Sequence, residues 1–291
     1  RLFQMNQASR TLLIGCAAAG AMSSIFKAPI AAIVFAIEVF SLDLTLISLL
    51  PLLLASVSAV LTSYFFFGSD TILPFTLTDE FVITEVPYYI LLGILAALCS
   101  SYFTRVYFRI NRIFKKFTSP FKRLLIGGLG LGILIFLIPP LYGEGYDVIN
   151  SLLEEDYLEA LGNNYFNAYL DNLWVVIALL AGLVIFKIIA TSLTFNAGGI
   201  GGIFAPVLFM GSTMGHCFAL LLNHLGLTRD PLSVSNFTLV GMTGLMAGVL
   251  HAPLTAIFLI AELTDGYELF VPLMITAAVS YMITIQFVPH S

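Results

Sequence analysis

Residues 20–38 read GAMSSIFKAPIAAIVFAIE, and residues 244–262 repeat the pattern as GLMAGVLHAPLTAIFLIAE. The two stretches align without a gap, from Gly20 on Gly244 to Glu38 on Glu262, and seven of the 19 aligned positions are identical. Both contain Ala-Pro followed by a glutamate nine residues after the proline, a pattern that biased composition alone does not explain. Such repeats are typical of membrane transporters in which two halves, usually inverted, face each other around a site near the bilayer midplane.

The composition is that of an integral membrane protein. Of the 291 residues, 59% are hydrophobic and 10% are charged, and the mean hydropathy is +1.00. A soluble domain has about 25% charged residues, whereas a bilayer span needs about 20 mostly apolar ones. We therefore expect an all-α, multi-pass fold in the lipid bilayer, with one transmembrane domain over residues 1–291. The apolar segments lie at 11–40, 43–67, 87–108, 124–142, 173–195, 203–225, 236–263 and 268–288.

Several of these segments contain residues that interrupt helices. In a bilayer, a broken helix persists only where protein or a wet cavity satisfies the freed backbone groups. Some segments are also long enough for one tilted helix or for two shorter helices end to end. We therefore expect two inverted halves of broken, tilted helices around a site near the bilayer midplane. The interrupting residues are Pro29, Pro51, Gly182, Pro206, Pro253 and Pro272.

Charged residues concentrate in two runs. Seven of the 12 Lys and Arg residues lie between Arg105 and Arg123, and seven of the 17 Asp and Glu residues lie between Glu144 and Asp171. We interpret both runs as solvated loops. The positive-inside bias makes the basic run cytoplasmic, and a single crossing at 124–142 makes the acidic run external. The net charge of −5 leaves no basic surface for nucleic acid.

A glycine run precedes one of the apolar segments, where residues 196–206 read NAGGIGGIFAP. Gly199, Gly201 and Gly202 let the backbone approach a ligand closely and adopt conformations that other residues avoid. Pro206 suits the first turn of a helix, where its missing N–H costs nothing. The alternative interpretation is a packing surface of small residues between helices.

A helix that starts at this run offers free backbone N–H groups and the positive end of its dipole. Ile203 and Phe204 are placed to donate their amides, while their side chains keep the pocket apolar. Such a site holds an anion without a fixed Lys or Arg, which would be costly in the bilayer and would release the anion slowly. The sequence therefore predicts a site for a monovalent anion at this helix start.

The same stretch resembles the GxFxP signature of the CLC family of chloride channels and transporters, with Gly202, Phe204 and Pro206 in the three named places. The resemblance implies a homodimer with one pore in each subunit. It also implies that chloride is the transported ion, held by the amides of Ile203 and Phe204 together with a Ser and a Tyr hydroxyl, without a cofactor. Similarity to prokaryotic members implies the bacterial inner membrane. Three further segments resemble family segments in the same order: 15–38, 143–149 and 241–276.

Part of the family's pore is not expected within this sequence. The pore Ser and the external gating Glu belong to motifs that would precede Arg1, and the pore Tyr would follow Ser291. The repeat agrees, because the alignment of Gly20 with Gly244 puts the partner of the glycine run before Arg1. We therefore expect the sequence to lack the start of its first half, and chloride and nitrate both stay open as substrates.

Glu38 and Glu262 occupy equivalent positions of the repeat and have two interpretations. Carboxylates within a membrane handle ions or protons by default, but a helix-end carboxylate is also satisfied by neighbouring amides. The repeat favours the second role, as two copies of one architectural contact. In family exchangers a proton-relay glutamate follows the position of Glu38, where this chain has Val39. The resemblance then implies channel-like or weakly proton-coupled transport, with a strict chloride/proton antiporter using another relay as the alternative.

Other polar residues of the spans have less specific interpretations. Lys187 either supplies positive potential near the anion path, or snorkels, or pairs with a carboxylate. His216 and His251 are expected to be satisfied core residues, and His251 matches Lys27 of the first repeat at a helix end. Met residues at 210, 242 and 246 are expected in the core. The uncharged segments 203–225 and 236–261 favour packing against a second copy of the chain.

An intramembrane enzyme is the rival class of function, and the sequence argues against it. The chain has no HExxH zinc motif, and GSTMG at 211–215 is not a nucleophile elbow. Cys16, Cys99 and Cys217 are isolated in apolar stretches, which argues against a disulfide framework or a thiolate metal site. We expect no metal and no catalytic residues.

Overall fold

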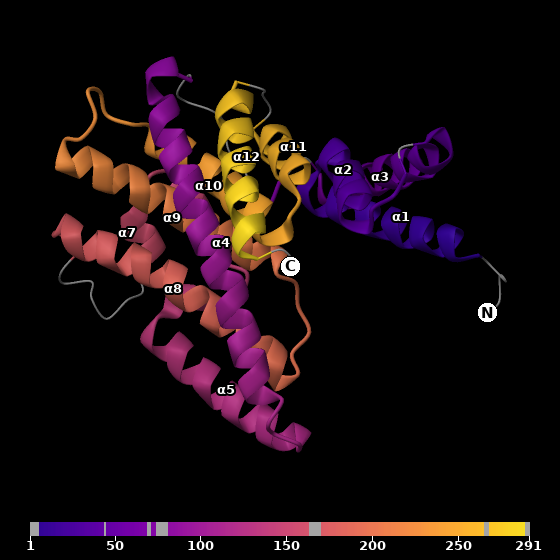
Figure 1. Cartoon of the computed structure of the whole chain (residues 1–291), viewed down its shortest axis with the longest axis horizontal. Coiled ribbons are helices and arrows are strands. Elements are labelled where there is room, and N and C mark those ends of the chain that lie inside the picture. Colours follow the sequence, from indigo (N-terminus) through magenta and orange to yellow (C-terminus); the bar gives the residue numbers. More distant parts are fainter. Residues whose placement is uncertain are drawn as a thin grey trace.

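The computed structural model describes residues 6–43, 45–68, 71–73, 81–162, 170–264 and 268–288. Within these residues every regular element is a helix, as predicted (Figure 1). Seven helical segments are long and apolar enough to cross a membrane, which confirms a multi-pass membrane fold. The α-helices are α1 (Gln7–Phe26), α2 (Pro29–Phe40), α3 (Leu46–Phe67), α4 (Val86–Phe114), α5 (Pro120–Leu137), α6 (Tyr146–Leu153), α7 (Tyr157–Leu161), α8 (Leu173–Ala197), α9 (Phe204–Leu225), α10 (Val234–Leu250), α11 (Pro253–Leu263) and α12 (Phe270–Phe287), and 3-10 turns span Ile83–Glu85 and Pro139–Leu141.

The two Ala-Pro sequences mark breaks between consecutive helices. The apolar segment at 11–40 forms α1 and α2, and the segment at 236–263 forms α10 and α11. Lys27 and His251 at the two breaks have a left-handed backbone with φ of 53°, the conformation that often ends a helix. The proline that follows occupies the first position of the next helix, where it leaves no N–H unpaired. The helix-end position expected for His251 is confirmed.

The first three and the last three helices correspond to each other in the alignment of the repeat. Figure 1 shows α2 next to α11, and hydrogen bonds join the two helices. The carboxylate of Glu38, near the end of α2, accepts hydrogen bonds from the amides of Leu254 (3.1 Å) and Thr255 (2.8 Å) at the start of α11. The Thr255 hydroxyl donates a further bond of 2.7 Å to the same carboxylate.

The equivalent contact joins Glu262, near the end of α11, to the start of α2. Its carboxylate accepts hydrogen bonds from the amides of Ile30 (3.0 Å) and Ala31 (2.7 Å). Each glutamate therefore caps the helix that carries the other, so α2 and α11 must run antiparallel. The two repeats are thus inverted, and the architectural contact favoured for both glutamates is confirmed.

Helices α9 and α10 cross closely because glycines lie at the contact. A Cβ atom on Gly211 would lie 2.6 Å from the Cα atom of Met242, and one on Gly241 would lie 2.8 Å from the Cα atom of Gly215. Side chains at these positions would push the helices apart, as in other membrane helix pairs with small residues four apart. A packing surface of small residues was the alternative interpretation of the run at 196–206. The structure has such a surface within α9, at Gly211 and Gly215.

Much of the two uncharged segments is buried within the chain. Residues 234–249 of α10 and residues 207–216 of α9 are buried, so the lack of charge there follows from packing inside one chain. The end of α9 and part of α11 are more exposed, with Leu225 at 47% and Leu254 at 54%. Packing of the segments 203–225 and 236–261 against a second copy stays a prediction.

The basic run is not simply a loop. Helix α4 continues to Phe114, so Arg105, Arg109 and Arg112 are helical, and only the residues just after them form the turn to α5. With the preceding 3-10 turn the helical segment has 32 residues, more than the roughly 20 that cross a bilayer, so its basic end extends beyond the apolar core. The acidic run likewise contains the short helices α6 and α7.

Candidate anion site at the start of helix α9

The glycine run first ends helix α8. Gly198 has φ of 106°, a left-handed conformation that favours glycine, and its amide donates to the Phe195 carbonyl at 3.2 Å. The amide of Gly199 donates to the Thr194 carbonyl at 2.9 Å. The unusual conformation therefore falls on Gly198 rather than on the three glycines predicted, and the Gly199 amide closes a helix instead of facing a ligand. Gly201 makes a close approach, since a Cβ there would lie 3.1 Å from a Phe195 ring carbon.

Helix α9 begins directly after the run. Ile203 is the capping residue, with φ of −85° and ψ of −10°, and no side chain caps the helix. The Ile203 carbonyl accepts the Val207 amide at 3.0 Å. For the amides of Ile203 and Phe204 themselves, the described residues provide no acceptor. Two backbone donors at a helix start are therefore left for a ligand, at the positive end of the helix dipole.

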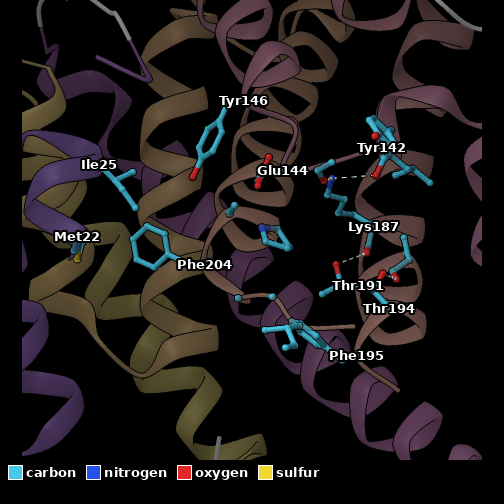
Figure 2. Close-up of a pocket in the computed structure, with 18 of the residues that line it drawn as sticks. Met22, Ile25, Tyr142, Glu144, Tyr146, Lys187, Thr191, Thr194, Phe195 and Phe204 are labelled. Carbon is cyan, nitrogen blue, oxygen red and sulfur yellow. Dashed lines mark hydrogen bonds between the residues drawn. The ribbon is translucent and has the colours of Figure 1, made fainter. Parts of the chain in front are cut away.

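Gly202 and Phe204, the residues on either side of Ile203, border a cavity of about 750 Å³, shown in Figure 2. The first turn of α9, including Pro206, forms part of its wall, and α1, α5, α8 and the segment at 141–146 form the rest. The Phe204 ring contacts Phe26 of α1 and Phe35 of α2, with ring centroids 5.3 Å and 6.3 Å apart. The cavity thus lies between the first repeat and α9, and its wall is mostly apolar.

Lys187 contributes a buried positive charge to the cavity wall. Its side chain is 2% exposed and lies over the Phe209 ring, 4.2 Å from the centroid. Its Nζ donates to the carbonyls of Leu141 (3.3 Å) and Gly143 (3.0 Å), as Figure 2 shows. Snorkelling is therefore wrong for this residue, because the amine points into the fold. Both acceptors are backbone carbonyls, and Lys187 lines the same cavity as the first turn of α9.

The segment GEGYDVI at 143–149 reaches the same cavity, which sequence reasoning missed. Gly143 and Gly145 have left-handed backbones, with φ of 64° and 88°, and a Cβ on Gly145 would lie 3.4 Å from the Lys187 Nζ. Glu144 lies between these two glycines and Tyr146 follows them, and both residues line the cavity. Burial, and then the Glu144 charge, raise the pKa of Tyr146 to about 12, so its hydroxyl remains a donor at neutral pH. The sequence feature that could have indicated this part of the cavity is the pair of glycines, Gly143 and Gly145, on either side of Glu144.

Neither Glu38 nor Glu262 is among the residues that line this cavity. Their carboxylates are engaged at the starts of α11 and α2, so a proton path through them stays a prediction. Val39 is 44% exposed on α2. The structure thus separates the capping glutamates from the helix start that has unpaired amides.

The remaining polar residues fit the expectations for a helical core in part. His216 is fully buried, with Nδ1 3.3 Å from the Thr238 hydroxyl. His251 is only partly buried, and its Nε2 has no hydrogen-bond partner among the described residues, so the prediction of a satisfied core residue is wrong there. The methionines at 210, 242 and 246 are buried, and Cys16, Cys99 and Cys217 are free thiols. Among the residues that the structure describes, no group of three His, Cys, Asp or Glu side chains is placed to hold a metal ion.

Comparisons with known proteins add to this geometry. The family model described as voltage gated chloride channel matches residues 1–284. The voltage-gated ClC-type chloride channel ClcB of Citrobacter koseri is 28% identical over 275 residues, which are 94% of this chain and 61% of that protein. The H(+)/Cl(-) exchange transporter ClcA of Yersinia pestis is 30% identical over 272 residues, 92% of this chain and 54% of that protein.

Solved structures share the fold. The structure of a slow cyanobacterial Cl-/H+ antiporter is similar with a TM-score of 0.77 at 24% identity, and the match covers 98% of this chain and 64% of that chain. The chain therefore spans less than two thirds of the length of each protein named here. The likeness supports the arrangement of helices around the start of α9.

Proposed function

This chain belongs to the voltage-gated chloride channel family, and from that premise we propose that it takes part in transmembrane transport of chloride or a similar monovalent anion. The observation that carries the proposal is the start of α9, where the amides of Ile203 and Phe204 have no acceptor among the described residues and where Gly202 and Phe204 line a mostly apolar cavity. Backbone donors on an apolar wall hold an anion without the strong attraction of a full positive charge, so the anion leaves again. The Lys187 ammonium attracts anions toward this point.

The ion is held, in this proposal, by the two amides, with Gly201 and Gly202 keeping the approach free of side chains. Pro206 needs no hydrogen-bond partner in the first turn, which keeps that turn compatible with an apolar surrounding. The transporting unit is a homodimer in the bacterial inner membrane. The relatives named as ClcA and ClcB are bacterial, which supports this location.

We further propose that proton coupling is weak or absent. A proton crosses an apolar stretch only along titratable groups or ordered water. Valine at position 39 offers no such group, and the neighbouring Glu38 is held by two amides and a hydroxyl of α11. The name of one relative is that of a channel and the name of another is that of an exchanger, so the two modes are the outcomes to be separated.

The anion site is tested by removing the backbone N–H of Ile203, with a second variant that controls for the loss of its side chain. Ile203 has a φ near the value that proline requires, and the preceding Gly202 has no Cβ to clash with a proline ring. In the full-length protein in proteoliposomes, Ile203→Pro should reduce chloride efflux about 10- to 100-fold, because a hydrogen bond to a charged group is lost. Ile203→Ala keeps the amide and should retain most of the efflux. Equal rates for both variants would contradict the proposal.

Coupling is tested by imposing a chloride gradient on the same proteoliposomes while the internal pH is followed. We expect chloride movement without uphill proton movement. Val39→Glu should introduce proton movement, with Val39→Gln as the matched control of similar size and no titratable group. Proton transport at a fixed stoichiometry by the unaltered protein would instead establish the strict antiporter.

A further inference from the structure

A second cavity lies far from the start of α9, where the basic end of α4 meets the end of α12. It has a volume of about 830 Å³. Three arginines of α4 form its polar part, and apolar side chains of both helices form the rest. Among the residues described by the structure, no Asp or Glu lines it. Its lining residues are Leu98, Ser101, Tyr102, Thr104, Arg105, Val106, Phe108, Arg109, Arg112, Phe287 and Val288.

The three arginines lie on one face of the helix. Arg105, Arg109 and Arg112 are spaced by four and three residues, so their side chains are neighbours on the surface of α4. Like charges at this spacing repel each other, and no carboxylate of the described wall offsets the repulsion. The cavity is therefore complementary to an anion, and guanidinium groups bind phosphate oxygens in pairs.

A buried hydroxyl adds an independent observation. Ser101 lies one turn before Arg105, is 6% exposed and lines the cavity, yet its Oγ has no hydrogen-bond partner among the described residues. The nearby Thr104 hydroxyl is already used, since it donates to the Ser100 carbonyl at 3.2 Å. A buried hydroxyl without a partner is costly in an apolar surrounding, so a ligand oxygen that accepts from Ser101 would stabilise the site.

The cavity also changes character along the helix. Leu98 is seven residues before Arg105, about 10 Å deeper toward the apolar part of the span, and is 54% exposed. Tyr102 lines the cavity between Leu98 and Arg105, whereas Phe108 lies at the level of the arginines. The arginines mark the cytoplasmic end of α4 by the positive-inside bias, where anionic lipid headgroups are found. A ligand with a phosphate at one end and hydrocarbon at the other fits this gradient, whereas free phosphate uses only the polar half.

We propose that this cavity binds an anionic phospholipid, with its phosphate on Arg105, Arg109 and Arg112 and the Ser101 hydroxyl. The acyl chains then lie along Leu98 and Tyr102. This site joins α4 to α12 through a lipid, and it is separate from the anion path proposed at α9.

The test counts bound lipids by native mass spectrometry of the full-length protein titrated with phosphatidylglycerol and, separately, with phosphatidylcholine. Arg105→Gln/Arg109→Gln/Arg112→Gln should weaken phosphatidylglycerol binding about 100-fold, since each cation near the surface contributes about fivefold. Ser101→Ala should weaken it severalfold without any change of charge. If the triple variant does not fold, Arg109→Gln alone should still show about a fivefold loss.

The matched control removes three charges from the same basic run but outside the cavity: Lys115→Gln/Lys116→Gln/Lys122→Gln. This variant should bind phosphatidylglycerol nearly as well as the unaltered protein. An equal loss in both triple variants would show diffuse attraction and overturn the proposal. Inorganic phosphate is the third probe, and displacement of the lipid by millimolar phosphate would make this a free-anion site and also overturn it.

Discussion

The starts of α2 and α11 differ from the start of α9 in what meets their backbone amides. At α2 and α11 a carboxylate from the other repeat accepts two amides of the first turn, at distances between 2.7 and 3.1 Å. At α9 no side chain caps the helix, and the residues before it are glycines. Pro29 and Pro253 remove one N–H from the starts of α2 and α11, but all three helix starts present free backbone donors and the positive end of a helix dipole. The main difference between them is therefore the acceptor.

The comparison shows how one backbone feature serves two purposes. A carboxylate tethered to the fold satisfies the amides permanently and ties the two repeats together. In the proposed function, the amides at α9 have no tethered acceptor and instead bind an anion that enters the cavity and is free to leave. Glu38 and Glu262 therefore belong to the scaffold, and the proposed transport site is the helix start that the scaffold leaves open.

The largest expected effect comes from removing the carboxylates that cap the starts of α2 and α11. Glu38→Ala removes the acceptor of two amides and one hydroxyl, and should lower the free energy of unfolding by about 3 kcal/mol. Glu262→Ala should cost a similar amount through the amides of Ile30 and Ala31. Thermal unfolding of the full-length protein in detergent measures both.

Gln variants at the same two positions are the controls, because a carboxamide retains one acceptor oxygen and should lose about half as much stability. If Glu38→Ala and Glu38→Gln unfold at the temperature of the unaltered protein, the carboxylate does not hold the two repeats together, and the comparison fails.

A second experiment places a carboxylate at the start of α9, so that this helix is capped as α2 and α11 are. A Cβ on Gly202 would lie 3.9 Å from the Phe204 nitrogen and would meet no other described atom within 4 Å beyond its chain neighbours, so Gly202→Asp places a tethered carboxylate beside that amide. The carboxylate should compete with the transported anion and reduce chloride efflux about tenfold or more, because a tethered group acts at high effective concentration.

Gly202→Asn has nearly the same shape without the charge, and should retain more of the efflux than Gly202→Asp. Chloride efflux from proteoliposomes at several chloride concentrations distinguishes the two, since high chloride should partly relieve the aspartate block. Equal loss in both variants would mean that steric obstruction, and not occupation of the amides, is responsible.

The smallest expected effect concerns a difference between the capped starts of α2 and α11, which is one extra hydroxyl at α11. Thr255 donates its hydroxyl to Glu38, whereas the equivalent residue of the first repeat is Ala31, which has no hydroxyl. Thr255→Ala should cost about 1.5 kcal/mol of unfolding free energy, the lower range for a hydrogen bond to a charged group. In the Glu38→Ala background the same substitution should cost much less, and a full additional loss there would show that the hydroxyl acts elsewhere.

Much of the helical layout follows from local patterns. Apolar runs, the Ala-Pro breaks and the internal repeat predicted the spans, the divided helices and the inverted pair. Other features did not follow from local patterns. The α4 helix continues through Arg105 and Arg112 because Lys and Arg are good helix formers and the chain has left the apolar core there. The sequence predicts that Gly199 lets the backbone approach a ligand, but its amide ends helix α8. It also predicts that Pro51 and Gly182 interrupt helices, but both lie within continuous helices, α3 and α8.

Hydropathy and the conformational limits of proline act over a few residues, so the sequence alone predicts a helical membrane protein with divided helices and an internal repeat. Which acceptor each polar group meets, and that the repeats are inverted, follows from the packing of the helices. Glu38 accepts hydrogen bonds from Leu254 and Thr255 of the other repeat. Lys187 donates to the carbonyls of Leu141 and Gly143, which precede its own helix in the sequence. Satisfying a buried donor or charge is a matter of position in space, so which amides remain open for an anion depends on the packing of the whole fold.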